Sequence, residues 1–347
     1  MKGSNMSQAE RKKSLVAVIG LGLMGRSIAA CLMAAGHHVM GVTDNLEASA
    51  GTPERIRALL AEMAEEGLLT GPVGPVLERF RLTAELPDIA GVEIVFESVT
   101  EDVNVKRELL HRIEHVVSPG CILATNTSAI PVSLMQEGAE RPERILGLHW
   151  DEPAHVTRFM EIIPGKATAP EYLDRIAELA LAWGKEPSTL RKEIRGFITN
   201  RISYAMFREA CHLVDSGVCT VEDVDRSLRN DVGWWIPFAG PFRYMDLMGV
   251  EGYQRVMRDL LPDLASSPEV PKLIREVVES GGRGISNGRG FYQYTPEEAR
   301  AWEEKFIEFN YRIRRLTAEY SAIQHGRKDD GRKDDGRKDD GRKDKQE

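Results

Sequence analysis

Three shortages narrow the possible functions of this chain. Only four of its 347 residues are cysteine, and no two of them form a Cys-x-x-Cys pair. Neither a disulfide framework nor a metal site is therefore predicted. No apolar run approaches the roughly 20 residues of a membrane-spanning helix, and no signal-peptide core follows the amino terminus. Positive charge is also in deficit, because the formal net charge is -8. We expect a cytoplasmic protein whose main partner is neither nucleic acid nor a membrane.

What the sequence does contain is enough apolar material, 42% of its residues, for two domains. Apolar strand-like runs alternate with helical patterns up to about residue 195, which is typical of a mostly parallel sheet covered on both faces. Beyond it only helical periodicity recurs. We predict an α/β fold, with a Rossmann dinucleotide-binding domain over residues 14–195 and an all-α domain over residues 196–320. Residues 326–347 repeat Gly-Arg-Lys-Asp-Asp and are predicted to form a solvated charged tail.

The most informative stretch joins an apolar run to a helix through Gly20-Leu-Gly-Leu-Met-Gly25. In such a turn the first glycine permits the tight bend, the second lets the backbone approach a pyrophosphate, and the third lets the helix lie close to the sheet. A second apolar strand ends in Asp44, at the position about 20 residues on where an acidic side chain reaches the adenosine ribose. A carboxylate there repels a 2′-phosphate, and no Arg or Lys follows before Pro53. The turn, with Leu23 and Met24 inside it, therefore predicts binding of NAD rather than NADP.

Polar side chains gather where later strands are predicted to end. Asn126 and Ser128 follow one strand, His149 ends the next, Glu161 lies on the strand after it, and Asn200 begins the helical region. A hairpin-like return between the two strands would bring His149 and Glu161 face to face. A carboxylate in that place fixes the tautomer of the imidazole and stabilises the imidazolium. We therefore expect His149 to take a hydroxyl proton while a hydride leaves the same carbon to NAD.

The chain resembles the L-3-hydroxyacyl-CoA dehydrogenase family from about Leu15 to Tyr294. Six motifs occur in the family's order, and together they are far more specific than any one of them. They are Gly20-Leu-Gly-Leu-Met-Gly25, Ala124-Thr-Asn-Thr-Ser-Ala-Ile130, Gly147-Leu-His-Trp-Asp-Glu-Pro153, Met160-Glu161, Gly196-Phe-Ile-Thr-Asn-Arg201 and Gly288-Arg-Gly-Phe-Tyr-Gln-Tyr294. Members of the family oxidise an L-3-hydroxyacyl thioester with NAD, and relatives act on carnitine or L-gulonate.

The resemblance implies roles for individual residues. His149 matches the general base, Glu161 the acid that orients it, and Ser128 the serine that binds the substrate hydroxyl. Asn200 matches the asparagine that holds the substrate carbonyl and the histidine. Glu101 and Lys106 match an acid-lysine pair beside the nicotinamide ribose, although a solvated helix face is also compatible with their spacing. Among the cofactor-binding residues we also count Asn126, and the resemblance further implies a homodimer formed through the helical domain.

Departures from the family pattern leave the substrate open. Glu152 stands where the family usually has Asn, which replaces a hydrogen-bond donor near the dyad with a charge. Short-chain acyl-CoA enzymes carry Ser and Lys on the helices that hold the CoA nucleotide, whereas this chain has glutamates at positions 62, 65 and 66, which would repel a CoA phosphate. Binding of CoA through Arg55 or Arg57 stays an alternative. The substrate is thus an L-3-hydroxyacyl-CoA or a free hydroxy acid, and a non-catalytic, crystallin-like NAD(H)-binding protein is the alternative from another class.

Two further features are ambiguous at this level. His155 is interpreted as a loop histidine with a possible substrate contact. The aromatic run Trp234-Trp235-Ile-Pro-Phe238 either shapes the substrate pocket or packs between helices or subunits.

Overall fold

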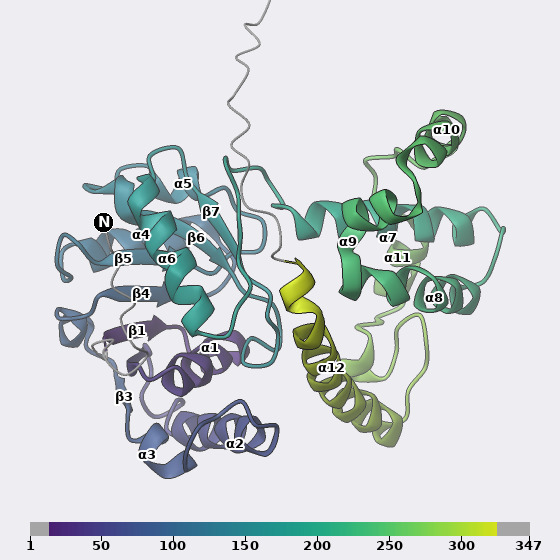
Figure 1. Ribbon diagram of the computed structural model, residues 1–347. Helices are drawn as coiled ribbons and strands as arrows, with labels where there is room; N and C mark the ends of the chain where they lie inside the picture. Colours follow the sequence, from purple (N-terminus) through teal and green to yellow (C-terminus); the bar gives the residue numbers. More distant parts are fainter. Residues whose placement is uncertain (1–13, 325–347) are drawn as a thin grey trace, which may run out of the picture.

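The computed structural model describes residues 14–324 and places them in two domains joined near Gly196 (Figure 1). The predicted charged tail over residues 326–347 lies outside this range. Among the residues described, no helix is both long and apolar enough to cross a membrane.

The first domain is built on one eight-stranded sheet with the order β3-β2-β1-β4-β5-β6-β7-β8. Strands β1 to β6 run parallel, β7 is antiparallel to β6, and β8 runs parallel to β7. The strand bounds are β1 Leu15–Ile19, β2 His38–Val42, β3 Phe80–Thr83, β4 Ile94–Glu97, β5 Ile122–Thr125, β6 Ile145–His149, β7 Glu161–Pro164 and β8 Ser188–Thr189. The predicted Rossmann architecture is confirmed.

Helices cover both faces of this sheet, as the near-continuous apolar strands require. The residues of β1 alternate between the two faces, with Val16 and Val18 in one core and Ala17 and Ile19 in the other. The first core is completed by α1 (Leu23–Ala34), α2 (Thr52–Glu65), α3 (Val73–Leu77) and α6 (Pro170–Ala182), and the second by α4 (Val103–Glu114) and α5 (Val132–Gln136). Short 3-10 helices span Leu86–Ile89 and Pro142–Arg144.

The second domain is helical, as predicted. It comprises α7 (Thr199–Asp215), α8 (Val221–Asn230), α9 (Val232–Met248), α10 (Val250–Leu260), α11 (Lys272–Glu279) and α12 (Pro296–Gln324), with 3-10 turns at Leu261–Asp263 and Ile285–Asn287. Helix α9 is interrupted at Gly240, whose φ of 65° is not helical. The last helix begins at Pro296, a residue favoured at the first position of a helix, and ends at Gln324, beyond the predicted end of the helical domain at residue 320. The helical region therefore continues past residue 320.

Few apolar side chains of the helical domain are buried within one chain. In α7 to α11, Cys211 is the one buried hydrophobic residue. By contrast, Trp234 is 78% exposed and Phe242 is 79% exposed, and both lie on α9. Apolar helix faces of this extent are stable only when another surface covers them.

Candidate active site

The glycine-rich turn has the geometry that the sequence predicts. Gly20 adopts a φ of +88°, and an added Cβ there would lie 2.5 Å from the carbonyl oxygen of Ser98. A Cβ on Gly25 would lie 1.8 Å from the carbonyl oxygen of Gly20, so the start of α1 packs directly on the turn. Around Gly22 the space is open, with no atom within 4 Å of an added Cβ. The backbone at Gly22 can therefore approach a pyrophosphate closely, at a helix N-terminus that attracts anions.

Asp44 is exposed just beyond the carboxyl end of β2. Strand β2 lies beside β1, from which the glycine-rich turn continues. The carboxylate is therefore at the same edge of the sheet as the turn, in the place where a ribose bound beside the turn presents its hydroxyl groups. The turn and Asp44 together fit NAD, which supplies the hydride acceptor of a dehydrogenase when it is bound.

The centre of the site is a pair formed by His149 and Glu161. The two residues face each other in the antiparallel register of β6 and β7, and the Nδ1 atom of His149 lies 2.8 Å from Oε2 of Glu161. Both side chains are buried. The carboxylate fixes a proton on Nδ1, which leaves Nε2 of the neutral imidazole free to accept a second proton.

The second oxygen of Glu161 connects this pair to the helical domain. Oε1 accepts hydrogen bonds from the backbone N–H groups of Ile198 and Thr199, both at 3.0 Å, where α7 begins. Burial alone would raise the pKa of Glu161. The hydrogen bond to His149 and the two backbone donors outweigh burial, so that the pKa lies below its usual value. The carboxylate is thus held ionised, which is the state that stabilises an imidazolium.

Two phenylalanines hold the His149 ring in place. Phe159 contacts it edge-on, with ring centroids 5.3 Å apart, and Phe197 contacts it at 5.6 Å. Phe197 has a φ of +52°, a conformation that costs a non-glycine residue about 1–3 kcal/mol. This strained residue lies at the junction of the two domains and packs directly on the imidazole. Sequence reasoning had assigned neither phenylalanine to the site.

The three polar residues from other strand ends lie near one another. The Nδ2 group of Asn200 donates to the carbonyl oxygen of Ser128 at 2.6 Å, which links α7 to the loop after β5. Asn126 accepts a hydrogen bond from the backbone N–H of Trp150, next to His149, at 3.2 Å. Within residues 14–324, no hydrogen bond joins the Ser128 hydroxyl or the Asn200 amide to His149. Both side chains are therefore available to a substrate.

Lys106 does not lie on a solvated helix face, because its side chain is fully buried. Its ammonium contacts Glu97 at 2.9 Å, the carbonyl oxygen of Asn126 at 3.0 Å and Glu101 at 3.5 Å. Glu101 in turn accepts a hydrogen bond from the backbone N–H of Ser128 at 2.9 Å. Lys106 therefore holds Glu97, Glu101 and the loop after β5 together from inside the protein. Glu101 is half exposed and is the member of the Glu101–Lys106 pair that can reach a ligand.

The comparison with known families agrees with this geometry. The model of the 3-hydroxyacyl-CoA dehydrogenase NAD-binding domain matches residues 15–194, and that of the 3-hydroxyacyl-CoA dehydrogenase C-terminal domain matches residues 196–294. The chain belongs to the 3-hydroxyacyl-CoA dehydrogenase family. As a member of this family it is an NAD-dependent oxidoreductase.

Individual relatives of the family differ in substrate. A 5-formyl-3-hydroxy-2-methylpyridine 4-carboxylate 5-dehydrogenase of Mesorhizobium japonicum is 31% identical over 304 residues, which cover 87% of this chain and 97% of the relative. A solved structure of such a dehydrogenase, described as an NAD+-dependent dismutase, has a TM-score of 0.82 at 29% identity and covers 88% of this chain and 99% of its own. The structure of a (S)-3-hydroxybutyryl-CoA dehydrogenase from Ralstonia eutropha has a TM-score of 0.68 at 26% identity, covering 82% and 100%.

The structure adds partners that the sequence did not indicate for His155 and for the glutamates at positions 62 and 66. His155 lies in a loop, as interpreted, but its side chain is buried, with Nδ1 2.8 Å from the Ser27 hydroxyl and Nε2 3.4 Å from Glu62. The pKa of Glu62 is lowered, mainly by this hydrogen bond to His155. Glu66 forms an ion pair with Arg315 of α12. Two of the three glutamates read as repelling CoA are therefore bound within the protein.

The site also includes a residue that sequence reasoning missed. Glu97 is fully buried at the end of β4 and is the primary ion-pair partner of Lys106. One feature of the sequence could have identified it, namely a carboxylate directly after the apolar run at residues 94–96. A charge at the end of a buried strand requires a partner, so this position indicates a buried ion pair.

Proposed function

We propose that this protein oxidises a hydroxyl-bearing carbon of a small carboxylic acid with NAD. The observation that carries the proposal is the buried His149–Glu161 pair, which lies at the same edge of the sheet as the open glycine-rich turn. Nε2 of His149 takes the hydroxyl proton as the carbon–oxygen double bond forms, and the hydride from the same carbon passes to NAD. The products are the carbonyl compound and NADH, with the proton left on the imidazole, and the reverse sequence reduces the carbonyl.

The surrounding residues have distinct parts in this proposal. Glu161 stabilises the imidazolium while remaining ionised. The Ser128 hydroxyl and the Asn200 amide hold the reacting oxygen, since Ser128 is exposed, Asn200 is half-buried, and the Asn200 amide donates to the backbone carbonyl of Ser128, which keeps the two residues together. Glu101 binds the nicotinamide ribose, and Lys106 fixes Glu101 and Asn126.

A free acid is preferred to a CoA thioester because of α2. Glu62 and Glu66 of this helical segment face Tyr311 and Arg315 of α12, so the helix surface is acidic and already covered by the chain's own last helix. The higher TM-score with the pyridine carboxylate dehydrogenase supports the same choice. An acyl-CoA substrate is the second candidate, because the family models match both domains.

The decisive experiment measures NADH formation. The substrate panel contains L-3-hydroxybutyryl-CoA, free 3-hydroxybutyrate, carnitine, L-gulonate and a hydroxymethyl-pyridine carboxylate, each with NAD and NADP. Turnover on free acids alone, abolished in His149→Ala, is the expected result. Turnover confined to the thioester would replace the first candidate with the second. Tight NADH binding with no turnover on any substrate would favour the non-catalytic alternative.

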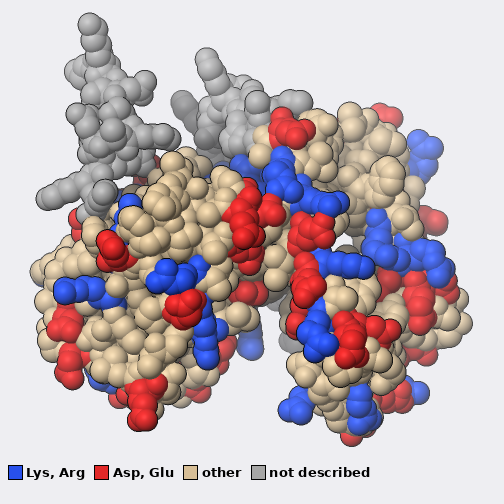
Figure 2. Space-filling view, turned by 90° about the horizontal axis from the view of Figure 1, so that it is seen from below, with Lys and Arg blue, Asp and Glu red and all other residues tan. Residues whose placement is uncertain are grey.

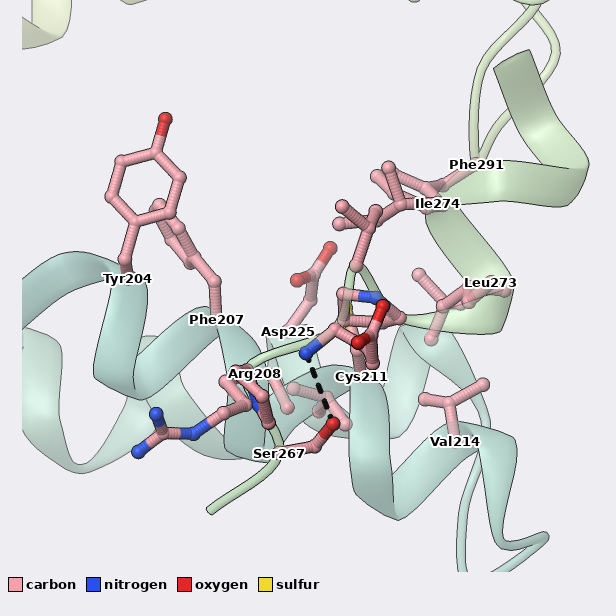
Figure 3. Close-up of a pocket in the computed structure, with 17 residues that line it drawn as sticks. Tyr204, Phe207, Arg208, Cys211, Val214, Asp225, Ser267, Leu273, Ile274 and Phe291 are labelled. Atoms are coloured by element: carbon pink, nitrogen blue, oxygen red, sulfur yellow. Dashed lines mark hydrogen bonds between the residues drawn. The ribbon is translucent and has the colours of Figure 1, made fainter. Parts of the chain in front are cut away.

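We also propose that the protein is a homodimer formed through its helical domain. An apolar pocket of about 720 Å³ opens between α7, α8 and α11 (Figure 3). Phe207, Val214, Leu273, Ile274 and Phe291 point into it. Together with the exposed aromatics of α9, this surface is the kind that a second copy of the chain covers.

We also propose a cytoplasmic location. The four cysteines are all free, which supports it.

Light scattering tests the dimer directly. The expected mass is that of two 38.8-kDa chains. Phe207→Arg in the pocket should reduce the mass to one chain, whereas Leu181→Arg, at a 63% exposed position on α6, should not. A monomeric wild-type protein at micromolar concentration would contradict the proposal.

A further inference from the structure

Helix α12 lies outside the residues that the family models match, yet it contacts both domains (Figure 1). Tyr320 packs edge-on against Phe238 of α9, with ring centroids 5.4 Å apart. Tyr311 is buried beside Glu62 of α2, although its hydroxyl does not reach ideal hydrogen-bond geometry. Figure 2 shows acidic and basic side chains interspersed along both sides of the boundary between the domains. The helix therefore bridges this boundary at a second place, separate from the covalent link at Gly196.

Arg314 makes two further contacts between α12 and the first domain. Its Nη1 donates to the carbonyl oxygen of Val156 at 2.6 Å, and its Nη2 donates to the carbonyl oxygen of Gly184 at 3.2 Å. Gly184 leaves space for the guanidinium, because an added Cβ there would lie 2.9 Å from Nη2. The planar guanidinium thus joins two backbone segments of the first domain in one fixed geometry.

Val156 belongs to the loop over residues 150–160 that separates the two members of the dyad. Lys185 donates to the carbonyl oxygens of Ala154 and Thr157 in the same loop, and the Ser27 hydroxyl accepts from the backbone N–H of His155 at 3.0 Å. Arg314 supplies the hydrogen bond at the carbonyl of Val156, which lies between these anchors. A buried carbonyl that loses its donor is destabilising, so the loop would move toward another partner.

The same loop leads directly to the imidazole. Phe159 lies near the end of this loop and contacts His149 edge-on at 5.3 Å. A shift of the loop is therefore passed to the His149 ring through Phe159, and to Glu161 through the start of β7.

We propose that α12 is a clasp and that Arg314 is a positioning residue, which holds the loop after His149 and so sets the geometry of the dyad. The inference rests on the proposed function in one respect, the role of His149 as the base. It makes the activity depend on a helix beyond both matched domains. Arg314 acts through the loop and touches neither substrate nor cofactor.

The test compares three full-length variants. Arg314→Met removes both hydrogen bonds and keeps the aliphatic stem. Arg314→Lys keeps one donor but cannot span both carbonyls. Arg312→Met is the matched control, since Arg312 is exposed on the same helix and pairs with Glu308 one turn away. We expect kcat of Arg314→Met to fall about 10- to 100-fold, as for a small misplacement of a catalytic group. KM for NAD should stay the same, Arg314→Lys should recover part of the loss, and Arg312→Met should behave as wild type.

Two readouts separate positioning from simple loss of stability. The pH profile of kcat/KM should shift in Arg314→Met, because the environment of His149 changes, and amide hydrogen exchange at Val156 and Thr157 should accelerate. Faster exchange with an unchanged kcat and pH profile would overturn the positioning role and leave the proposed function standing. Unchanged exchange would overturn the clasp itself. Because exchange needs no substrate, it decides on the clasp even if the proposed function fails.

Discussion

Replacing Glu161 by Gln is the sharpest perturbation of the proposed mechanism. The carboxylate makes three hydrogen bonds as an acceptor, one from His149 Nδ1 and two from the backbone of Ile198 and Thr199. A glutamine amide has one oxygen and one NH₂ group, so it cannot satisfy all three. If its NH₂ faces His149, the imidazole is driven to the tautomer with a proton on Nε2, which cannot act as a base. If the NH₂ faces α7, it opposes two N–H donors and the helix loses its cap.

Both orientations predict a large loss of activity. An analogous change of a carboxylate that orients a catalytic histidine lowers kcat by about 10⁴ with little change in geometry. We expect a decrease of about 10³- to 10⁴-fold in kcat for Glu161→Gln, measured as NADH formation. KM for NAD should change little, because Glu161 does not face the glycine-rich turn. Glu137→Gln, an exposed residue paired with Arg107, is the control and should retain wild-type activity.

The same substitution predicts a pH-dependent loss of stability. The pKa of Glu161 is lowered in the folded protein, so its stabilisation is complete above the unfolded value of about 4.5 and is lost as pH falls through the folded value. Urea unfolding should show a deficit of about 1–3 kcal/mol for the variant at pH 7, as expected for a hydrogen-bonded charge. The deficit should shrink below pH 4.5.

The activity measurement decides on the mechanism. A Glu161→Gln variant with a kcat within a factor of 10 of wild type would refute the role given to the dyad.

Three further substitutions test other groups. Burial lowers the pKa of Lys185 to about 8. Between pH 8 and 10.5 the unfolded chain therefore binds this proton more tightly than the folded protein does, so the free energy of unfolding rises with pH. Relative to Lys185→Met, the wild-type free energy of unfolding should rise by about 3 kcal/mol over this range. Burial raises the pKa of Glu152, which destabilises its ionised form; Glu152→Gln should increase the melting temperature at pH 8 and have little effect at pH 4. Asp44→Ala should reduce the preference for NAD over NADP by about tenfold, the equivalent of roughly one hydrogen bond, as measured by the ratio of kcat/KM for the two cofactors.

The first domain could be predicted from the sequence because its signals are local. The apolar run that forms β1 ends at Gly20, and the glycine-rich turn fixes the order of strand, turn and helix within one short segment. The approach of His149 to Glu161 was also predictable, since His149 ends one strand and Glu161 begins the next strand after a hairpin-like return. Exact boundaries were less accessible. Phe159 adjoins the apolar run of β7 yet lies in the loop before it, because the strand begins only at Glu161, where pairing with His149 and Ser188 starts.

Contacts between distant segments escaped prediction for a physical reason. The partner of a buried charge is set by the packing of whole elements, so Lys106 alone did not reveal Glu97, and His155 alone did not reveal Ser27 and Glu62. The strained φ of Phe197 likewise follows from the junction of two domains, since phenylalanine carries no preference for that conformation.

The glutamates of α2 show how a correct reading of charge can lead to an incomplete conclusion. Their negative potential was evident from the sequence, and it does oppose a phosphate group. The sequence did not indicate that these glutamates have partners within the chain. Arg315 forms an ion pair with Glu66, and Tyr311 lies beside Glu62. A surface that repels an external anion is here the surface that binds the last helix. The charges that would oppose a CoA phosphate therefore also attach α12, and a variant that neutralises Glu62 and Glu66 should weaken the attachment of the helix.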